Sequence, residues 1–376
     1  MKTLKLGMVG GGQGAFIGGV HRIAARLDGQ WDLVAGALSS DPQRAETSAQ
    51  ELGIERSYSD FRQMAQAEAA RDDGIDAVAI VTPNHMHADP TIAFLEAGIH
   101  VICDKPLAAT AEDAARIKTA AEASSAHFIL THNYTGYPMI RQAREMVQTG
   151  DLGKLRLVQV EYAQDWLTEP AASDNKQADW RTDPARSGAG AIGDIGTHAF
   201  NLAHFVTGEV PSHLAADLSS MVPGRQVDDN AHILLRYASG ARGMLWASQV
   251  AVGNENGLRL RVYGDRGGLE WSQEHPNHMH FTRFGQPTQT LTRGGAGASD
   301  AANAVTRVPG GHPEGYLEGF ATLYAEAAAL IRGDQSVDLL PDLQSGLLGM
   351  AFISGALESS KKDSCWYRFP SNVLDS

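Results

Sequence analysis

The chain has 376 residues, of which 40 are glycine and two are cysteine, and its formal net charge is −13. This length predicts two domains of roughly 100–200 residues each, and a hydrophobic share of 43% excludes an intrinsically disordered chain. The acidic balance, with its basic residues dispersed, argues against nucleic acid or an anionic membrane as the main partner.

Cysteine usage and the first residues predict the compartment. Cys103 and Cys365 form no CxxC motif and are too few for a disulfide framework, which favours a reducing environment. The apolar run that opens the chain leads straight into glycines and lacks the features of a signal peptide. No apolar run approaches the ~20 residues that a membrane helix needs. We therefore expect a soluble, cytoplasmic protein.

The first third of the chain alternates short apolar runs with helical segments. The expected strands are residues 4–9, 31–38, 75–81, 100–103 and 127–130. The expected helices are 18–27, one that Asp41 caps and Pro42 begins, one that Asp89 caps and Pro90 begins and that ends at Gly98, and 110–123. Short buried strands separated by helices predict a doubly wound parallel sheet.

The pattern changes after about residue 150. Residues 155–162, 231–237, 241–246, 258–262 and 269–271 alternate as antiparallel strands with one covered face do. Helices over 315–331 and 343–360 close the chain, and residues 286–311 are expected to form a long loop. The predicted fold class is α/β, with a parallel-sheet domain over 1–134 and an α+β domain over 135–376. The second domain has a large, mostly antiparallel, open-faced sheet.

The first strand runs into a glycine-rich loop. Glycines between a strand and a helix let the backbone approach a pyrophosphate, and the helix N-terminus adds N–H groups and partial positive charge. The spacing from Gly12 to Gly18 is longer than in the usual GxGxxG motif. The prediction of dinucleotide binding therefore depends on the position of the loop directly after the first strand. The alternative is a surface turn without a ligand. The expected cofactor contacts are Gly10, Gly12, Gln13, Gly14, Ala15, Phe16 and Ile17.

The end of the second strand bears on the choice of dinucleotide. An acid there would bind the ribose 2′-OH and favour NAD. The strand instead ends at Ser39 and Ser40, Asp41 is occupied as a helix cap, and Arg44 lies one turn into the helix. Hydroxyls beside a cation suit a 2′-phosphate, so NADP is favoured slightly over NAD. The alternative is that Arg44 is a solvated helix residue.

Three more segments follow apolar stretches: Thr82-Pro83-Asn84-His85-Met86-His87, Cys103-Asp104-Lys105-Pro106 and Gly-Asp-Ile-Gly-Thr-His at 193–198. With the glycine loop, these ordered motifs resemble the glucose–fructose oxidoreductase / inositol dehydrogenase / rhizopine catabolism family (Gfo/Idh/MocA) over nearly the whole chain. The resemblance implies a Rossmann domain and an NAD(P)-dependent oxidoreductase. It also implies a second subunit packed on the open sheet face, hence a homodimer or homotetramer.

The resemblance implies the catalytic residues. Lys105 matches the lysine of a Glu-Lys-Pro motif beside the nicotinamide and the substrate hydroxyl, with Asp104 in place of the usual Glu. Asp194 and His198 match the family's Asp-x-x-x-His. A lysine near a charged nicotinamide would have a depressed pKa, and a carboxylate can orient an imidazole as general base. The alternatives are a surface lysine, a helix cap and a packed core histidine.

The resemblance extends to the ligand contacts. It places Thr82, Pro83, Asn84, His87, Asp104, Lys105 and Asn133 at the cofactor. The expected substrate contacts are Lys105, Tyr134, Tyr162, Trp166, Trp180, Arg181, Asp194, His198 and His312. Aromatic rings pack against the C–H faces of sugars, while core packing is the alternative for the large aromatics. His275, His278 and His280 lack the further ligands that zinc needs, so no metal is expected.

The predicted function is therefore hydride transfer between NAD(P) and a secondary hydroxyl of a sugar, inositol or related polyol. Two alternatives share the fold: an NAD-dependent glycoside hydrolase without net redox, and a dinucleotide-binding sensor, which should lack Lys105 and His198. The charge of −13 fits a small neutral substrate better than a sugar phosphate. It does not oppose dinucleotide binding, because loop N–H groups are not counted in net charge.

Overall fold

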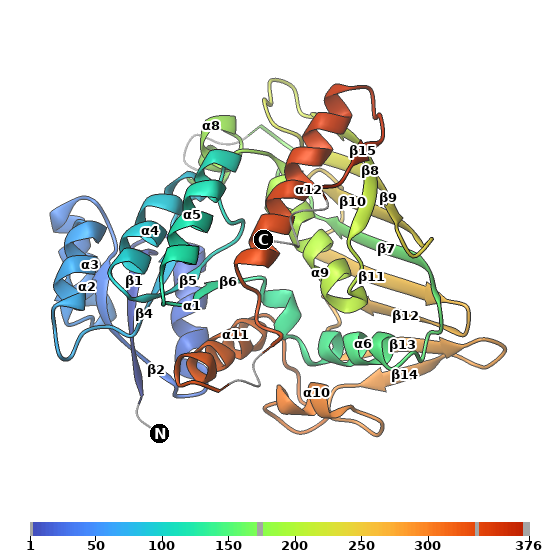
Figure 1. Cartoon of the computed structure of the whole chain (residues 1–376), viewed down its shortest axis with the longest axis horizontal. Coiled ribbons are helices and arrows are strands. Elements are labelled where there is room, and N and C mark those ends of the chain that lie inside the picture. The colour runs from blue at the N-terminus through green and yellow to red at the C-terminus, as the bar shows by residue number, and fades with distance from the viewer. Residues whose placement is uncertain (1–2, 171–175, 335–337, 371–376) are drawn as a thin grey trace. The chain divides into compact units, whose positions relative to one another are not determined.

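The computed structural model describes residues 3–170, 176–334 and 338–370, and the chain divides into two compact units. The first unit combines Met1–Asn133 with Tyr316–Leu347. The second combines Tyr134–Gly315 with Leu348–Ser376. Figure 1 gives the elements and their labels. In the described part of the chain, no helix has both the length and the apolarity needed to cross a membrane.

The first unit is built on a six-stranded, wholly parallel sheet in the order β3-β2-β1-β4-β5-β6. Its strands are β1 (Leu4–Gly10), β2 (Trp31–Ala37), β3 (Arg56–Ser57), β4 (Ala77–Val81), β5 (His100–Cys103) and β6 (Phe128–Leu130). Its helices are α1 (Phe16–Leu27), α2 (Pro42–Leu52), α3 (Phe61–Ala69), α4 (Ala88–Glu96), α5 (Ala111–Ala123) and α11 (Tyr316–Ile331), with the short η1 (Asn84–Met86). The central strand β4 is buried throughout, as apolar strands covered on both faces must be.

The helix caps of the first unit test the expected helix starts. Asp41 caps α2 as predicted, accepting the Arg44 N–H at 2.8 Å. The expectation that Asp89 caps α4 was wrong. Because η1 runs directly into the helix, His87 already has helical backbone angles and Asp89 lies in the first turn. There its carboxylate pairs with Arg116 at 2.6 Å and Arg62 at 3.1 Å.

A helix from late in the chain completes the core of the first unit. Phe320 and Tyr324 of α11 are buried in one cluster with Leu6, Ala24 and Trp31. Figure 1 shows α11 beside α1. The Trp31 indole N–H donates to the Tyr324 carbonyl at 2.8 Å, so the late helix is bonded as well as packed.

The second unit is built on a nine-stranded sheet in the order β14-β13-β12-β11-β7-β10-β9-β8-β15. Its strands are β7 (Leu155–Ala163), β8 (Pro211–Ser219), β9 (Asn230–Tyr237), β10 (Arg242–Ser248), β11 (Gly257–Gly264), β12 (Gly267–Ser272), β13 (His278–Arg283), β14 (Gln289–Thr292) and β15 (Tyr367–Arg368). Its helices are α6 (Pro138–Gln148), α7 (Lys176–Arg181), α8 (Pro184–Ser187), the π-helix η3 (Ile192–Gly196), α9 (Thr197–Thr207) and α10 (Asp300–Ala304). The last helix, α12 (Leu343–Lys361), begins in the first unit and lies mostly in the second.

The predicted α/β fold class, with a parallel sheet and a larger, mostly antiparallel sheet, is confirmed. Two details were wrong. Strands β7 and β10 pair in parallel, because the chain between them crosses over through α9, β8 and β9. The expected loop over 286–311 contains β14, which extends the sheet beside β13, and α10, which Ser299 caps.

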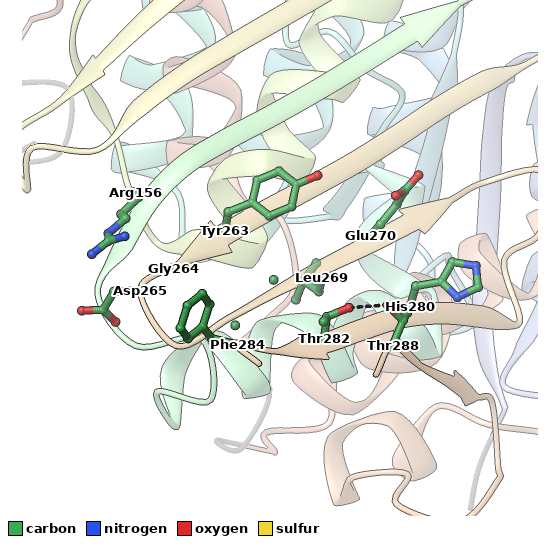
Figure 2. Close-up of a pocket in the computed structure, with 12 residues that line it drawn as sticks. Arg156, Tyr263, Gly264, Asp265, Leu269, Glu270, His280, Thr282, Phe284 and Thr288 are labelled. Atoms are coloured by element: carbon green, nitrogen blue, oxygen red, sulfur yellow. Dashed lines mark hydrogen bonds between the residues drawn. The ribbon is translucent and has the colours of Figure 1, made fainter. Parts of the chain in front are cut away.

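One face of the large sheet is covered by helices and the other is open. Helices α6 and α9 lie over the covered face (Figure 1), where Leu269, Trp271 and Met279 are buried. The alternating Glu270 and His280 point the other way, into a hollow of about 800 Å³ on the open face (Figure 2).

Candidate active site

The glycine loop fits a dinucleotide. Gly10, Gly11 and Gly14 have φ of 78°, 72° and 78°, a backbone region that favours glycine. A Cβ on Gly18 would lie 2.5 Å from the Gly11 Cα, so loop and helix meet as backbone against backbone. Helix α1 begins at Phe16 with no side-chain cap and no acid in its first turn. Its N–H groups and partial positive charge are thus left for an anion.

A hollow of about 630 Å³ adjoins this loop, lined by Gly12, Gln13, Gly14, Ala15, Phe16, Arg22, Ser48, Glu51 and Leu52. Sequence reasoning missed Arg22, a basic residue on the first turns of α1. Its guanidinium donates to the Gly11 carbonyl at 2.6 Å, and burial lowers its pKa. Arg22 therefore supports the loop backbone and brings a cation to the hollow. The Gln13 amide donates to the Glu51 carboxylate at 2.7 Å, and Ile17 packs against the core.

The segment after β2 is held by local hydrogen bonds. The Ser39 hydroxyl accepts the Asp41 N–H at 3.2 Å, and the Asp41 carboxylate accepts the Arg44 N–H. Ser40 and the Arg44 side chain are exposed. Because Asp41 is committed to its cap, the second strand offers hydroxyls and a guanidinium, and no uncommitted acid, at this point.

His87 fastens the turn after β4 to the Lys105 segment. Its buried ring has Nδ1 2.8 Å from the Pro106 carbonyl and Nε2 2.9 Å from the Thr82 carbonyl. Burial lowers the pKa of His87, and a neutral ring donates to only one of these oxygens at a time. Pro83 leads into η1, where Asn84 is buried.

Asp104 anchors Lys105 through the backbone. Asp104 Oδ1 accepts the Lys105 N–H at 2.9 Å and the Thr131 hydroxyl at 3.0 Å, so the lysine follows a rigid turn after β5. Sequence reasoning missed His21 of α1, whose Nε2 lies 4.0 Å from the same oxygen. The His21 Nδ1 is 2.8 Å from the Tyr324 hydroxyl of α11. Burial lowers the pKa of His21 to about 4 although Asp104 opposes this, so the ring is neutral at neutral pH.

His132 and Asn133 are buried polar residues that follow β6. Burial lowers the pKa of His132 to about 3, and the charge of Lys105 adds to the effect. Asn133 is buried, and within the described residues its Nδ2 has no hydrogen-bond partner. A buried amide donor without a partner is costly, so it suits a ligand acceptor.

In the second unit, Asp194 lies inside the π-helix η3, which continues as α9 with His198 in its first turn. Asp194 is therefore no helix cap. Its Oδ2 accepts the Gln249 amide at 2.9 Å and lies 3.2 Å from Arg181 Nε. The Arg181 guanidinium stacks on Trp180 at 4.3 Å, so the predicted Trp-Arg pair and Asp194 form one group.

His198 lies among tyrosines that head a chain of hydrogen bonds. Its ring centroid is 5.0 Å from that of Tyr134 and 6.1 Å from that of Tyr162. The two hydroxyls are 2.6 Å apart, and Tyr162 donates to Asn256 Oδ1 at 2.7 Å. Burial raises the pKa of Tyr134. The hydrogen bonds continue from Asn256 to Gln164, whose amide donates to Asn256 Oδ1 at 2.8 Å. The indole of the half-exposed Trp166 in turn donates to Gln164 Oε1 at 2.9 Å.

Sequence reasoning missed the amides of this cluster. Gln164, Gln249 and Asn256 lie just beyond or before the ends of β7, β10 and β11. Polar residues at the ends of alternating strands were the available signal, but which strand ends meet depends on the sheet order. Because these amides lie beside the aromatic side chains, the cluster can form hydrogen bonds with the hydroxyls of a ligand.

His312, His278 and His280 make their contacts within their own loop or sheet edge. The exposed ring of His312 lies 3.2 Å from the Pro309 carbonyl, within its own loop. His278 and His280 are exposed on β13, and His280 Nδ1 lies 3.1 Å from the Thr290 hydroxyl. In residues 3–170, 176–334 and 338–370, no three His, Cys, Asp or Glu side chains gather as they would around a metal ion.

A parallel sheet with a glycine loop at its first strand defines a Rossmann dinucleotide-binding unit, and the second unit is built on a large open-faced sheet. The chain belongs to the Gfo/Idh/MocA family, as its motifs predicted. The oxidoreductase-family model with NAD-binding Rossmann fold matches residues 4–132, and the GFO/IDH/MocA C-terminal domain model matches residues 140–270.

Three relatives show what the chain is similar to. A solved oxidoreductase from Sinorhizobium meliloti is 54% identical, with a TM-score of 0.90 over 98% of this chain and 100% of that one. An inositol dehydrogenase homolog from Azotobacter vinelandii, complexed with NADH and myo-inositol, is 36% identical, with a TM-score of 0.91 over 98% of both chains. Levoglucosan dehydrogenase from Pseudarthrobacter phenanthrenivorans is 30% identical over 74% of this chain and 76% of its own.

Proposed function

We propose that this oxidoreductase transfers a hydride between NAD(P) and a secondary hydroxyl of a small neutral sugar, inositol or related polyol. The observation that carries the proposal is the cluster of tyrosines, tryptophans and amides around Asp194 and His198. Its cation, Arg181, lies 3.2 Å from Asp194, so the pair is close to neutral and suits an uncharged, hydroxyl-rich ligand. Myo-inositol, which the related Azotobacter structure contains beside NADH, is a ligand of this kind.

The chain's residues divide the work as follows. The glycine loop and Arg22 hold the pyrophosphate, and the Asn133 amide bonds the cofactor. His198 takes the hydroxyl proton, and Asp194 supports its basicity. Lys105, fixed by Asp104, polarises the hydroxyl oxygen. Bound nicotinamide supplies the hydride acceptor, and the aromatic rings align the carbon that gives up the hydride.

The decisive experiment is a substrate panel. Purified protein is mixed with sugars, anhydrosugars and inositols in the presence of NAD or NADP, and reduced nicotinamide is followed by its absorbance. We expect stoichiometric reduction with one or a few neutral polyols and none with sugar phosphates. Sugar release from glycosides without reduced cofactor would point to the hydrolase instead. Tight dinucleotide binding with no turnover on any member would contradict the proposal and favour a sensor.

We also propose a homodimer or homotetramer formed through the open face of the large sheet. That face exposes Leu157, Leu234 and Met244, with exposed fractions of 47%, 53% and 41%, beside charged residues. Exposed apolar side chains gathered on one sheet face are typical of an interface. Light scattering should give at least twice the chain mass at micromolar concentration, and Leu234→Asp should shift it toward the monomer. A wild-type monomer would contradict this proposal.

A further inference from the structure

A single carboxylate grips the backbone that leads into the π-helix η3. The Gly190 N–H donates to Asp228 Oδ1 at 2.8 Å, and the Ile192 N–H donates to Asp228 Oδ2 at 2.7 Å. The Ala191 N–H between them donates to the Asp228 main-chain carbonyl at 2.8 Å. Three successive N–H groups therefore end on one residue that lies 36 to 38 positions away along the chain.

The approach is close enough to require glycine. A Cβ on Gly190 would lie 1.7 Å from the Asp228 carbonyl oxygen. The two backbones are thus in direct contact, and the two carboxylate oxygens bind the N–H groups on either side of Ala191. Gly190 in turn accepts the Asp194 N–H at 2.9 Å, so the grip reaches the first residues of η3.

We propose that Asp228 is a positioning residue, whose charged carboxylate holds the turn that presents Asp194 and His198, and that protonation of this carboxylate releases the turn. This inference rests on the proposed function, in which Asp194 and His198 act on the substrate. Asp228 acts through the backbone of residues 190–192 and touches neither side chain in its described hydrogen bonds.

The chemistry of the carboxyl group explains the release. An ionised carboxylate accepts both N–H groups in charge-assisted bonds, whereas a protonated one is uncharged and its O–H oxygen is a weaker acceptor. Burial raises the pKa of Asp228 to about 6, the charge of Asp229 adds to this rise, and the two N–H donors oppose it. A carboxyl that stays in place but loses these donors therefore has a still higher pKa, so protonation favours the state in which the turn is released. The charged group that acts on Asp228 is the adjacent Asp229, which itself pairs with Arg225 at 3.5 Å. On the bound segment, the next charged residue is Asp194, two positions after Ile192 in η3.

The test compares two adjacent acids. Asp228→Asn keeps one acceptor oxygen but turns an NH₂ toward the other N–H, and Asp228→Ala removes both acceptors. Asp229→Asn is the matched control, because Asp229 accepts the Met221 and Val222 N–H groups and none from residues 190–192. Each variant is examined for kcat, dinucleotide affinity and amide hydrogen exchange of the peptide over 188–198.

We expect kcat to fall about 10-fold to 100-fold in Asp228→Asn, as misplaced catalytic groups cause, with dinucleotide affinity within about twofold of wild type. The 188–198 amides should exchange faster in this variant but not in Asp229→Asn. After correction for intrinsic rates, wild-type protection of these amides should fall as pH drops through about 6. In Asp228→Asn it should not depend on pH.

Unchanged kcat with unchanged exchange in a folded Asp228→Asn would overturn the proposal. So would wild-type protection that stays constant from pH 7 to 5 while the protein remains folded, a measurement that needs no variant. The exchange measurement does not depend on the substrate. If no polyol is oxidised but amide exchange changes as expected, the proposed function is wrong and the positioning role of Asp228 for the turn is still supported.

Discussion

In each unit, an aspartate accepts backbone N–H groups next to or near a candidate catalytic residue. The two aspartates differ in how far along the chain these N–H groups lie. Asp104 accepts the N–H of its immediate neighbour Lys105, so the anchor and the anchored residue belong to one turn. Asp228 accepts N–H groups 36 and 38 residues upstream, so its grip exists only when the sheet unit has folded. The local anchor needs only its own turn to form, whereas the distant one needs the second unit to have folded.

The largest expected effect comes from removing the anchored residues themselves. Lys105→Ala and His198→Ala should each lower kcat by about 10²-fold to 10⁴-fold, the usual contribution of a positioned proton-transfer group. Dinucleotide affinity, measured by fluorescence titration, should change little. The partly exposed Lys118 of α5 and the exposed His278 of β13 supply the matched controls Lys118→Ala and His278→Ala, which should retain activity. Full activity in either active-site variant would remove that residue from the mechanism.

Removing the local anchor should cost less. Asp104→Ala takes away the acceptor of the Lys105 N–H and the Thr131 hydroxyl, and we expect kcat to fall by about 10-fold or more as the lysine loses its fixed turn. Asp104→Asn keeps an acceptor oxygen and should fall less. If the two variants had equal kcat, the charge of Asp104, rather than its acceptor geometry, would be the important property.

The buried His21 next to Asp104 predicts a pH effect on stability. Its folded-state pKa of about 4 is below its unfolded value of 6.5, so the unfolded chain binds a proton first as pH falls. Stability is therefore lost below pH 6.5, by about 2 kcal/mol at pH 5. Replacing both partners, as His21→Phe with Tyr324→Phe, should remove this loss. Thermal melts at pH 7 and pH 5 measure it, and an unchanged pH dependence would contradict it.

The smallest expected effect is on the choice between NADP and NAD. It concerns the exposed Arg44, whose N–H is bound by Asp41, another aspartate that acts on a near neighbour. We propose that Ser39, Ser40 and Arg44 favour NADP. Arg44→Ala should raise KM for NADP several-fold and leave KM for NAD unchanged, because only the 2′-phosphate carries the extra charge. Arg71→Ala, an exposed arginine elsewhere in the unit, is the control. A wild-type preference for NAD would contradict the proposal.

The same contrast explains how far sequence reasoning reached. The strands of the parallel sheet, the glycine loop and the Asp41 cap could be predicted from patterns within single segments, and the Asp104-Lys105 segment was found through the family resemblance. The π-helix at Asp194 and the partners Gln249 and Asn256 were not. Gln249 is bonded to a residue 55 positions away, and Asn256 to one 94 positions away. A residue pattern shows which side chains are polar, but only the sheet order decides which of them meet.

The late helix α11 has a consequence for the order of synthesis. The first unit finishes its β-strands by Leu130, yet Tyr324 must bond His21 and Trp31 before its core is complete. The Pro341 carbonyl even accepts the Leu130 N–H at the edge of β6. At typical translation rates, α11 leaves the ribosome roughly 10–40 s after β6. The nascent first third of the chain therefore has an unfinished core while nearly all of the second unit is made.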